Sequence, residues 1–275
     1  MQVLQGYRIA ALVTNLPGPV AAARLCGLGA SVTKIEPPHG DLLENAAPGW
    51  YAQLTTGMDV RRGDLRELTA NGGIDALLGD TDVLLTAIRV RALAANGMDE
   101  SRLRERFPRL SHVALVGEAP PDGDRPGHDL TYQARAGIIV PPAMPRALVA
   151  DMAAAERAVS TVLAALLHRE RTGETTFATV GITEATLEFA LAYEYGLTRE
   201  NGALSGAWPA YHIYRAADGW VALAALEPHF AERTREALGL HSFDIQALEA
   251  VFATRTAQAW EQFAEQHDLP LAAVR

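Results

Sequence analysis

Two carboxylates and a histidine stand close together in the sequence, and the second carboxylate has few polar neighbours. His128 and Asp129 belong to residues 127–133, and Asp151 follows about twenty positions later, between a Pro-rich segment and a run of alanines. An Asp with so few polar neighbours is energetically unfavourable unless a hydrogen bond, a helix N-terminus or a catalytic task compensates. As a reacting group, Asp151 could attack an activated acyl carbon, or act as acid or base beside a carbon acid.

Each of these three residues also has an ordinary structural explanation. Asp151 could be the N-cap of the following helix, a use of Asp that contributes about 1 kcal/mol. His128 could be a loop histidine, and Asp129 could hydrogen-bond the backbone of its own turn. The residues alone leave the catalytic and the structural interpretations open.

A candidate ligand-binding loop lies near the N-terminus. Asn15, Leu16 and Pro17 follow a predicted strand and precede a predicted helix, which is where a phosphate or carboxylate can meet a helix N-terminus. The loop lacks the G-x-G-x-x-G pattern of a dinucleotide-binding site. A purely structural turn is the alternative.

Strands and helices are predicted to alternate through the first part of the chain and to position these residues. Apolar runs predict strands at 7–13, 30–35, 82–86, 110–116 and 176–180, and longer patterns predict helices at 20–28, 64–78 with a break at 71–73, 99–107, 150–171 and 184–195. This alternation is typical of α/β folds with a parallel sheet covered by helices on both faces. Ligands in such sheets bind beyond the carboxyl ends of the strands, here in the loops after residues 13, 35, 86 and 116.

The pattern changes after residue 200. An Asn- and Gly-containing segment at 201–206 precedes a predicted β-hairpin at 211–225, and predicted helices follow at 228–238, 244–252 and 257–266. We therefore expect a large domain at 1–200 and a small α+β domain at 201–275.

Composition argues against several classes of function. The net charge is −9, and Lys34 is the only lysine. An acidic chain without a basic cluster is not expected to bind nucleic acid or an anionic membrane, and no apolar run approaches the roughly 18 residues that span a bilayer. Cys26 is the only cysteine, so neither an internal disulfide nor a cysteine-based metal site is predicted. The N-terminus lacks a secretion-signal pattern, and a cytoplasmic location is expected.

A series of motifs resembles the family III CoA-transferases, the carnitine dehydratase and bile-acid-inducible group that also contains α-methylacyl-CoA racemase. The motifs keep the family's order over nearly the whole chain, at residues 4–10, 17–19, 28–41, 127–130, 150–151, 163–173, 214–221 and 268–274. The resemblance implies a large Rossmann-like domain, a small α+β domain and an interlocked homodimer. It also implies a coenzyme A thioester as substrate, with no permanently bound cofactor.

The resemblance further implies a mechanism of CoA transfer between carboxylic acids. The aspartate that matches Asp151 would attack the acyl-CoA to form a mixed anhydride and release CoA, which later returns to make the new thioester. His128 and Asp129 would orient the acyl carbonyl or the nucleophile. A Gly-rich loop of the small domain, of which Gly202 and Gly206 are present here, would stabilise the oxyanion.

Two other functions fit the same resemblance. Racemases of the family use residues matching His128 and Asp151 as an acid/base pair around the α-carbon, although they follow the aspartate with glycines where this chain has Met152. A non-catalytic acyl-CoA-binding protein is the third interpretation, because several basic CoA-binding groups of the family are missing and the family normally continues past residue 275. Among the remaining basic residues, Arg89 and Arg91 are the best candidates to hold CoA. Our expectation is a homodimeric acyl-CoA:carboxylate CoA-transferase that binds an acyl-CoA and a carboxylic acid.

Overall fold

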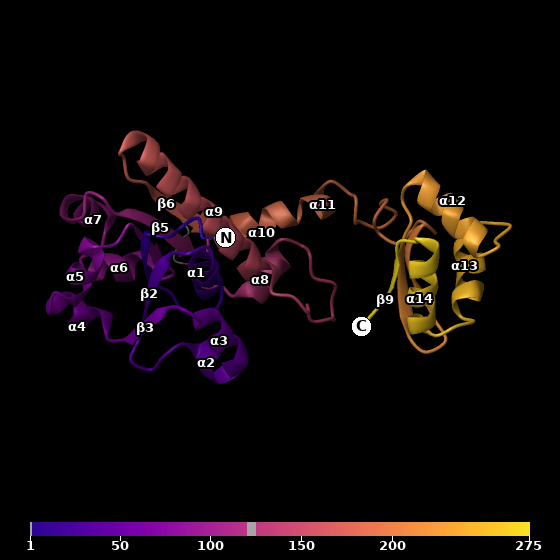
Figure 1. Cartoon of the computed structure of the whole chain (residues 1–275), viewed down its shortest axis with the longest axis horizontal. Helices are drawn as coiled ribbons and strands as arrows, with labels where there is room; N and C mark the ends of the chain where they lie inside the picture. Colours follow the sequence, from indigo (N-terminus) through magenta and orange to yellow (C-terminus); the bar gives the residue numbers. More distant parts are fainter. Residues whose placement is uncertain (1, 120–124) are drawn as a thin grey trace. The chain divides into compact units, whose positions relative to one another are not determined.

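The computed structural model describes residues 2–119 and 125–275. The chain folds into two compact units, Met1–Ala190 and Leu191–Arg275 (Figure 1). The boundary expected from the sequence, after residue 200, stays a prediction. Within the described residues, no helix combines the length and the apolar character that crossing a membrane requires.

A six-stranded sheet forms the centre of the first unit, with the strand order β3-β2-β1-β4-β5-β6. All five neighbouring pairs are parallel. The strands are β1 (Arg8–Leu12), β2 (Ser31–Glu36), β3 (Asp59–Arg62), β4 (Val83–Thr86), β5 (Ser111–Val116) and β6 (Phe177–Gly181). This arrangement confirms the predicted α/β class, because parallel neighbours must be joined by crossover segments, which are helical here.

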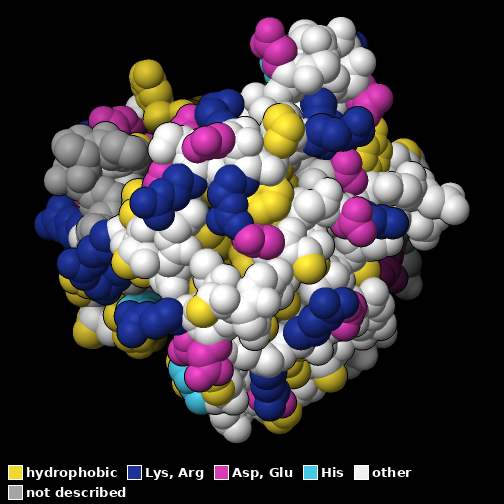
Figure 2. Space-filling model, turned by 90° about the vertical axis from the view of Figure 1, so that its left-hand side faces the viewer, with side chains coloured by type: hydrophobic (Ala, Val, Ile, Leu, Met, Phe, Trp, Pro, Cys, Tyr) yellow, Lys and Arg dark blue, Asp and Glu magenta, His cyan; other side chains and the backbone are white. Residues whose placement is uncertain are grey.

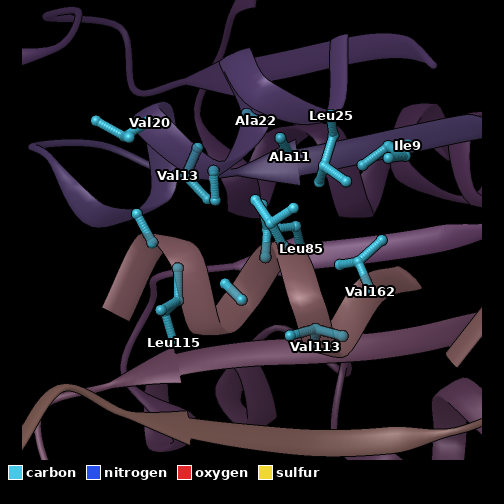
Figure 3. Close-up of a cluster of buried hydrophobic side chains, with 14 of the residues drawn as sticks. Ile9, Ala11, Val13, Val20, Ala22, Leu25, Leu85, Val113, Leu115 and Val162 are labelled. Atoms are coloured by element: carbon cyan, nitrogen blue, oxygen red, sulfur yellow. The ribbon is translucent and has the colours of Figure 1, made fainter. Parts of the chain in front are cut away.

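Helices cover the sheet and divide its side chains between two cores. Along β1, Ile9 and Ala11 belong to one core and Ala10 and Leu12 to the other, as the alternation of a strand requires. The first core contains α1 (Pro17–Gly27) and α9 (Val149–Thr172), which pack against β1, β4 and β5 (Figure 3). The second contains α5 (Gly73–Gly79), α6 (Val90–Ala95) and α7 (Glu100–Arg106). The other helices of this unit are α2 (Leu42–Ala46), α3 (Pro48–Thr55), α4 (Leu65–Ala70), α8 (Asp129–Arg135) and α10 (Ile182–Phe189).

The long helix α9 packs closely because its buried face consists of small side chains. Ala154, Ala158 and Val162 recur at helical spacing and are fully buried. The helix ends at Gly173, whose φ of 77° lies in the left-handed region that glycine adopts without strain. The alanines hold the first turn of α9, which carries Asp151, against the sheet.

The second unit contains a three-stranded antiparallel sheet of β7 (Tyr211–Arg215), β8 (Trp220–Ala224) and β9 (Leu271–Ala273). Tyr214, Phe252 and Trp260 form the aromatic centre of its core. The helices of this unit are α11 (Leu191–Glu194), α12 (Pro228–Ala237), α13 (Ile245–Phe252) and α14 (Ala257–His267). The predicted hairpin and the three predicted helices after it are therefore confirmed.

Some elements were not expected from the sequence. The edge strand β3 is largely exposed and ends in Arg61 and Arg62, so it has no apolar alternation to reveal it. No helix was predicted between residues 117 and 149, but α8 begins at Asp129. The single helix expected at 184–195 is interrupted at Ala190, between α10 and α11.

Candidate active site

A pocket of about 280 Å³ opens at the carboxyl ends of β1, β4, β5 and β6. β1 and β4 are neighbours in the sheet. After β1 the chain continues to β2 on one side of this pair, and after β4 it continues to β5 on the other side. Ligands of open α/β sheets bind at such a point. The lining residues are Thr14, Asn15, Pro17, Ala87, Ile88, Arg89, Leu115, Val116, Gly117, Arg125, Pro126, Gly127, His128, Tyr132, Asp151 and Ile182.

The pocket brings together residues that are far apart in the sequence. Five of the residues predicted from the sequence line it, namely Asn15, Pro17, Arg89, His128 and Asp151. Leu16 and Arg91 are not among the lining residues. Leu16 lies between the lining residues Asn15 and Pro17, and Arg91 lies two positions after the lining residue Arg89. Gly202 and Gly206 belong to the second unit.

Asp151 is the third residue of α9, and Leu148 occupies the N-cap position. The interpretation of Asp151 as the N-cap is therefore wrong. Its backbone N–H donates instead to Asp129 Oδ1, with an N–O distance of 3.1 Å. A carboxylate from another helix thus satisfies this N–H of the first turn, and the Asp151 side chain is left to line the pocket.

The Asp151 carboxyl lies in an environment that disfavours its charged form. Burial, and to a smaller extent the negative charge of Asp129, raises the pKa of Asp151 from an ordinary 3.8 to about 7. The helix N-terminus favours the anion, but the effect of burial is greater. A carboxyl that ionises near neutral pH inside a pocket is typical of catalytic groups.

Asp129 is a buried residue with two anchored oxygens. Only 5% of its surface is exposed. Oδ1 accepts the Asp151 N–H, and Oδ2 accepts a hydrogen bond from Gln133 Nε2 at 2.5 Å. The sequence left open that Asp129 hydrogen-bonds the backbone of its own turn. In the structure, the backbone N–H that it accepts belongs to Asp151, so Asp129 connects α8 to α9.

His128 is the N-cap of α8 rather than a residue within a loop. Its backbone N–H donates to Thr131 Oγ1 at 3.0 Å, which fixes the start of the helix. The residue is exposed and lines the pocket. An imidazole at this place is accessible to a ligand.

Two pocket residues, Tyr132 and Arg125, were not anticipated from the sequence. Tyr132 is 3% exposed, and a Cβ added at Gly127 would lie 2.5 Å from its Cζ, while a Cβ at Gly117 would lie 2.7 Å from its hydroxyl. Both glycines thus leave room for the phenol beside the pocket. Arg125 forms an ion pair with Glu118 at 3.5 Å. The only signal for either residue was its position in the segment after β5.

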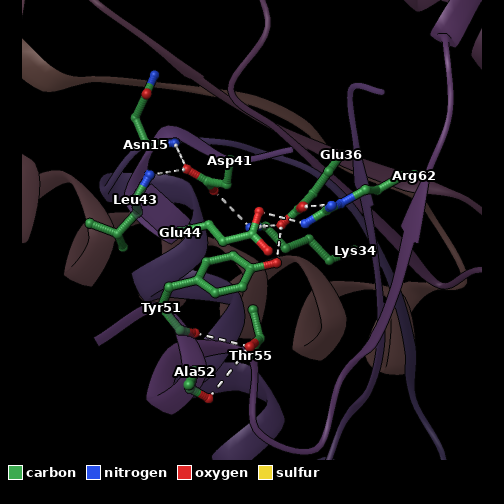
Figure 4. Close-up of polar contacts among 10 residues, drawn as sticks. All are labelled: Asn15, Lys34, Glu36, Asp41, Leu43, Glu44, Tyr51, Ala52, Thr55 and Arg62. Carbon is green, nitrogen blue, oxygen red and sulfur yellow. Dashed lines mark hydrogen bonds and ion pairs between the residues drawn. The ribbon is translucent and has the colours of Figure 1, made fainter. Parts of the chain in front are cut away.

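A buried charge network supports the Asn15 loop (Figure 4). Lys34 Nζ contacts Glu36 Oε1 at 2.7 Å and Asp41 Oδ2 at 2.8 Å, and the Lys34 and Glu36 side chains are completely buried. Asp41 Oδ1 accepts the backbone N–H of Asn15 at 3.1 Å. Asn15 itself has a φ of 66°, an uncommon conformation that Asn tolerates better than most residues. The only lysine of the chain therefore helps to fix one wall of the pocket.

A second pocket of about 280 Å³ adjoins the first and shares Thr14 and Ile88 with it. Its lining is mostly apolar and comprises Leu12, Val13, Thr14, Ile35, Glu36, Pro37, Pro38, Gly63, Asp64, Leu65 and Ile88. Together the two pockets extend along the carboxyl edge of the sheet from β3 to β6. Among the described residues, no group of three or more His, Cys, Asp or Glu side chains is arranged to hold a metal ion.

The described residues on the face of the molecule that Figure 2 presents form no single basic patch. Figure 2 shows arginine side chains distributed among Asp and Glu side chains on the face that it presents. On this face, individual arginines and backbone N–H groups are the groups that could hold an anion.

The chain belongs to CoA-transferase family III, whose sequence pattern matches residues 4–275. It is 34% identical over 189 residues to the probable fatty acyl-CoA transferase Rv3272 of Mycobacterium tuberculosis, a match that covers 62% of this chain and 48% of the relative. The crystal structure of that relative superimposes with a TM-score of 0.82 and 26% identity, covering 100% of this chain and 83% of the other. The chain thus spans about half the length of this curated relative in the sequence match.

Relatives with different reactions occur among the matches. A succinyl-CoA:mesaconate CoA-transferase of Haloarcula marismortui is 29% identical over 275 residues, covering 86% of this chain and 67% of the relative. Human alpha-methylacyl-CoA racemase is 28% identical over 260 residues, covering 88% of this chain and 66% of the relative. Membership of the family alone does not distinguish transfer from racemisation.

Proposed function

We propose that this protein transfers CoA from one carboxylic acid to another through an acyl anhydride on Asp151. An Asp151 oxygen attacks the thioester carbonyl, the C–S bond breaks, and CoA leaves as the thiolate. A carboxylate oxygen of the acceptor acid then attacks Cγ of Asp151, the bond between Cγ and the bridging oxygen breaks, and the donor acid leaves as a carboxylate. Finally the thiolate attacks the new anhydride, which forms the new thioester and frees the Asp151 carboxylate.

The observation that carries this proposal is the raised pKa of Asp151 in the pocket. Burial and the neighbouring Asp129 charge disfavour its anion and raise its pKa to about 7. Acylation converts that anion into an uncharged acyl carboxyl. The same surroundings that destabilise the free carboxylate therefore favour the anhydride relative to it.

The remaining residues of the pocket have roles that follow from their positions. Arg89 is exposed at the pocket and carries a guanidinium suited to a CoA phosphate. The apolar second pocket suits the flat adenine ring, so that the pantetheine arm would reach Asp151 past Thr14 and Ile88. His128 would orient the acyl carbonyl. We include a homodimer in this proposal.

Trapping with hydroxylamine tests the proposed anhydride. The protein is incubated with a panel of acyl-CoAs and hydroxylamine, and peptide mass spectrometry locates any hydroxamate. We expect a hydroxamate on Asp151 in the wild-type protein and none in Asp151→Asn. Acyl-CoA binding without a hydroxamate, and without turnover, would instead support a binding protein.

Racemisation of a 2-methylacyl-CoA is the second candidate. It is favoured by the presence of His128 and Asp151 in one pocket, because a racemase needs an acid and a base around the α-carbon. This function requires deuterium incorporation at the α-carbon in deuterium oxide without any acceptor acid. Deuterium incorporation without a hydroxamate would replace the transferase proposal by this one.

A further inference from the structure

Gln133 is a buried amide beside Asp129 that the proposed reaction does not use directly. It is 2% exposed, lies one turn after Asp129 on α8, and is not among the residues that line the pocket. Its Nε2 donates to Asp129 Oδ2 at 2.5 Å and to Ala147 O at 3.0 Å. Both N–H groups of the amide are therefore committed to acceptors.

These contacts form a continuous chain of hydrogen bonds around the start of α9. Ala147 precedes the helix, Gln133 connects its carbonyl to Asp129, and Asp129 accepts the N–H of Asp151. Both ends of the chain lie in the segment 147–151. The orientation of the Asp129 carboxylate is thus fixed from both of its oxygens.

A primary amide is the side chain that suits this place. Two N–H donors must meet two acceptors, a carboxylate and a backbone carbonyl, in a space closed to water. Glu at position 133 would direct an acceptor at both of them, and Met would fill the volume without supplying any donor. The residue type is therefore explained by its hydrogen bonds rather than by packing alone.

We propose that Gln133 is a positioning residue for the reaction: it fixes the Asp129 carboxylate, which in turn holds the first turn of α9 and directs Asp151 into the pocket. This inference rests on the proposed function, in which Asp151 is the reacting group. A merely structural role would affect how much protein folds, whereas a positioning role changes the reaction of each folded molecule.

The test compares the wild type, Gln133→Met and Gln133→Glu in the rate of hydroxamate formation at Asp151, measured against acyl-CoA concentration and pH. We expect Gln133→Met to lower the rate at saturating acyl-CoA about tenfold, with KM within about twofold, because Gln133 does not line the pocket. The midpoint of its pH profile should fall below that of the wild type, since a released Asp129 no longer faces Asp151. Thr81→Val is the matched control, as it removes a buried hydroxyl at the opposite end of β4.

Gln133→Glu preserves the shape of the side chain and provides a second criterion. Its rate relative to the wild type should recover as the pH falls, because a protonated carboxyl again supplies an O–H donor. A wild-type rate and an unchanged pH midpoint in either variant would overturn the role of Gln133. Absence of any hydroxamate in the wild type would overturn the proposed function itself, so the two failures are distinguishable.

Discussion

The Asp129 carboxylate accepts a hydrogen bond from the backbone N–H of Asp151, and this contact at 3.1 Å links α8 to the first turn of α9. It has two opposing effects. The contact supplies an acceptor for one N–H of the first turn of α9, and it places a second negative charge beside the carboxyl of Asp151. Removing that charge while keeping an acceptor separates the two effects.

Asp129→Asn should lower the pKa of Asp151. The wild-type pKa of about 7 arises first from burial and second from Asp129, so the variant should show a value below 7 but still above 3.8. The pH dependence of hydroxamate formation, or a carbon NMR titration of the carboxyl, measures it. A midpoint that stays near 7 would show that burial alone sets the value.

Asp151→Asn should stabilise the protein at neutral and higher pH. Because the folded state raises the pKa of Asp151, the folded chain holds its proton longer than the unfolded chain, and stability falls as the pH rises from about 3.8 to about 7. After allowance for partial exposure, we expect a gain of ~1–3 kcal/mol above pH 7 and none below pH 4. Urea unfolding at several pH values tests this, and a gain that is equal at all pH values would contradict it.

His112 should make the fold sensitive to acid. Burial lowers the pKa of this histidine to about 4 from 6.5, and its Nε2 lies 2.9 Å from Thr86 Oγ1. The unfolded chain therefore takes up a proton that the folded chain refuses, and stability is lost as the pH falls from about 6.5 towards 4. His112→Gln should remove about 2–3 kcal/mol of this pH dependence. The exposed His241 supplies the control, since His241→Gln should leave the acid profile unchanged.

Lys34→Met should destabilise the first unit strongly. The change leaves the buried carboxylates of Glu36 and Asp41 without their shared cation, which typically costs about 3–5 kcal/mol. Arg61→Met, which breaks an exposed pair with Asp59, should cost less than about 1 kcal/mol. Denaturant unfolding of both variants measures the difference. Equal decreases in the free energy of unfolding would show that the buried pairs of Lys34 stabilise the fold no more than the exposed pair of Arg61 does.

Gly127→Ala should disturb the pocket wall. The added methyl would lie 2.5 Å from Tyr132 Cζ, so either the buried ring or the backbone beside His128 must shift, at a cost of about 1–3 kcal/mol. We expect lower thermal stability together with a raised KM for acyl-CoA. Gly79→Ala meets no atom within 4 Å and should be neutral or slightly stabilising. A Gly127→Ala protein that matches the Gly79→Ala protein in both measurements would refute the expectation.

The sequence predicted the elements that have a strong period and a clear end. The helix now seen as α9 was predicted because its apolar spacing ends at Thr172 and Gly173, and the hairpin because Asp218 and Gly219 separate two apolar runs. The helix α8 was missed because its polar residues resemble a loop when they are considered without their partners. Such residues become helical through contacts with α9 and the sheet, which no local pattern contains.

The same reason explains what was missed in the site. The types of His128, Asp129 and Asp151 indicated chemistry, but the pairing of Asp129 with the Asp151 N–H depends on where two helices meet. The importance of Gln133 is visible only from its acceptors, one of which is a backbone carbonyl. Every residue has a backbone carbonyl, so the sequence cannot indicate which carbonyl a given side chain will contact.

Because Lys34 is buried, the reactivity of its side chain can measure local unfolding around β2. It is the only lysine in the chain, and none of its surface is exposed. Amine-directed reagents, and proteases that cleave after lysine, should therefore find no lysine side chain to modify or cleave at while β2 stays in place. The rate at which protein labelled at Lys34, or the two fragments from one cut after Lys34, accumulate would measure how often β2 detaches from the sheet.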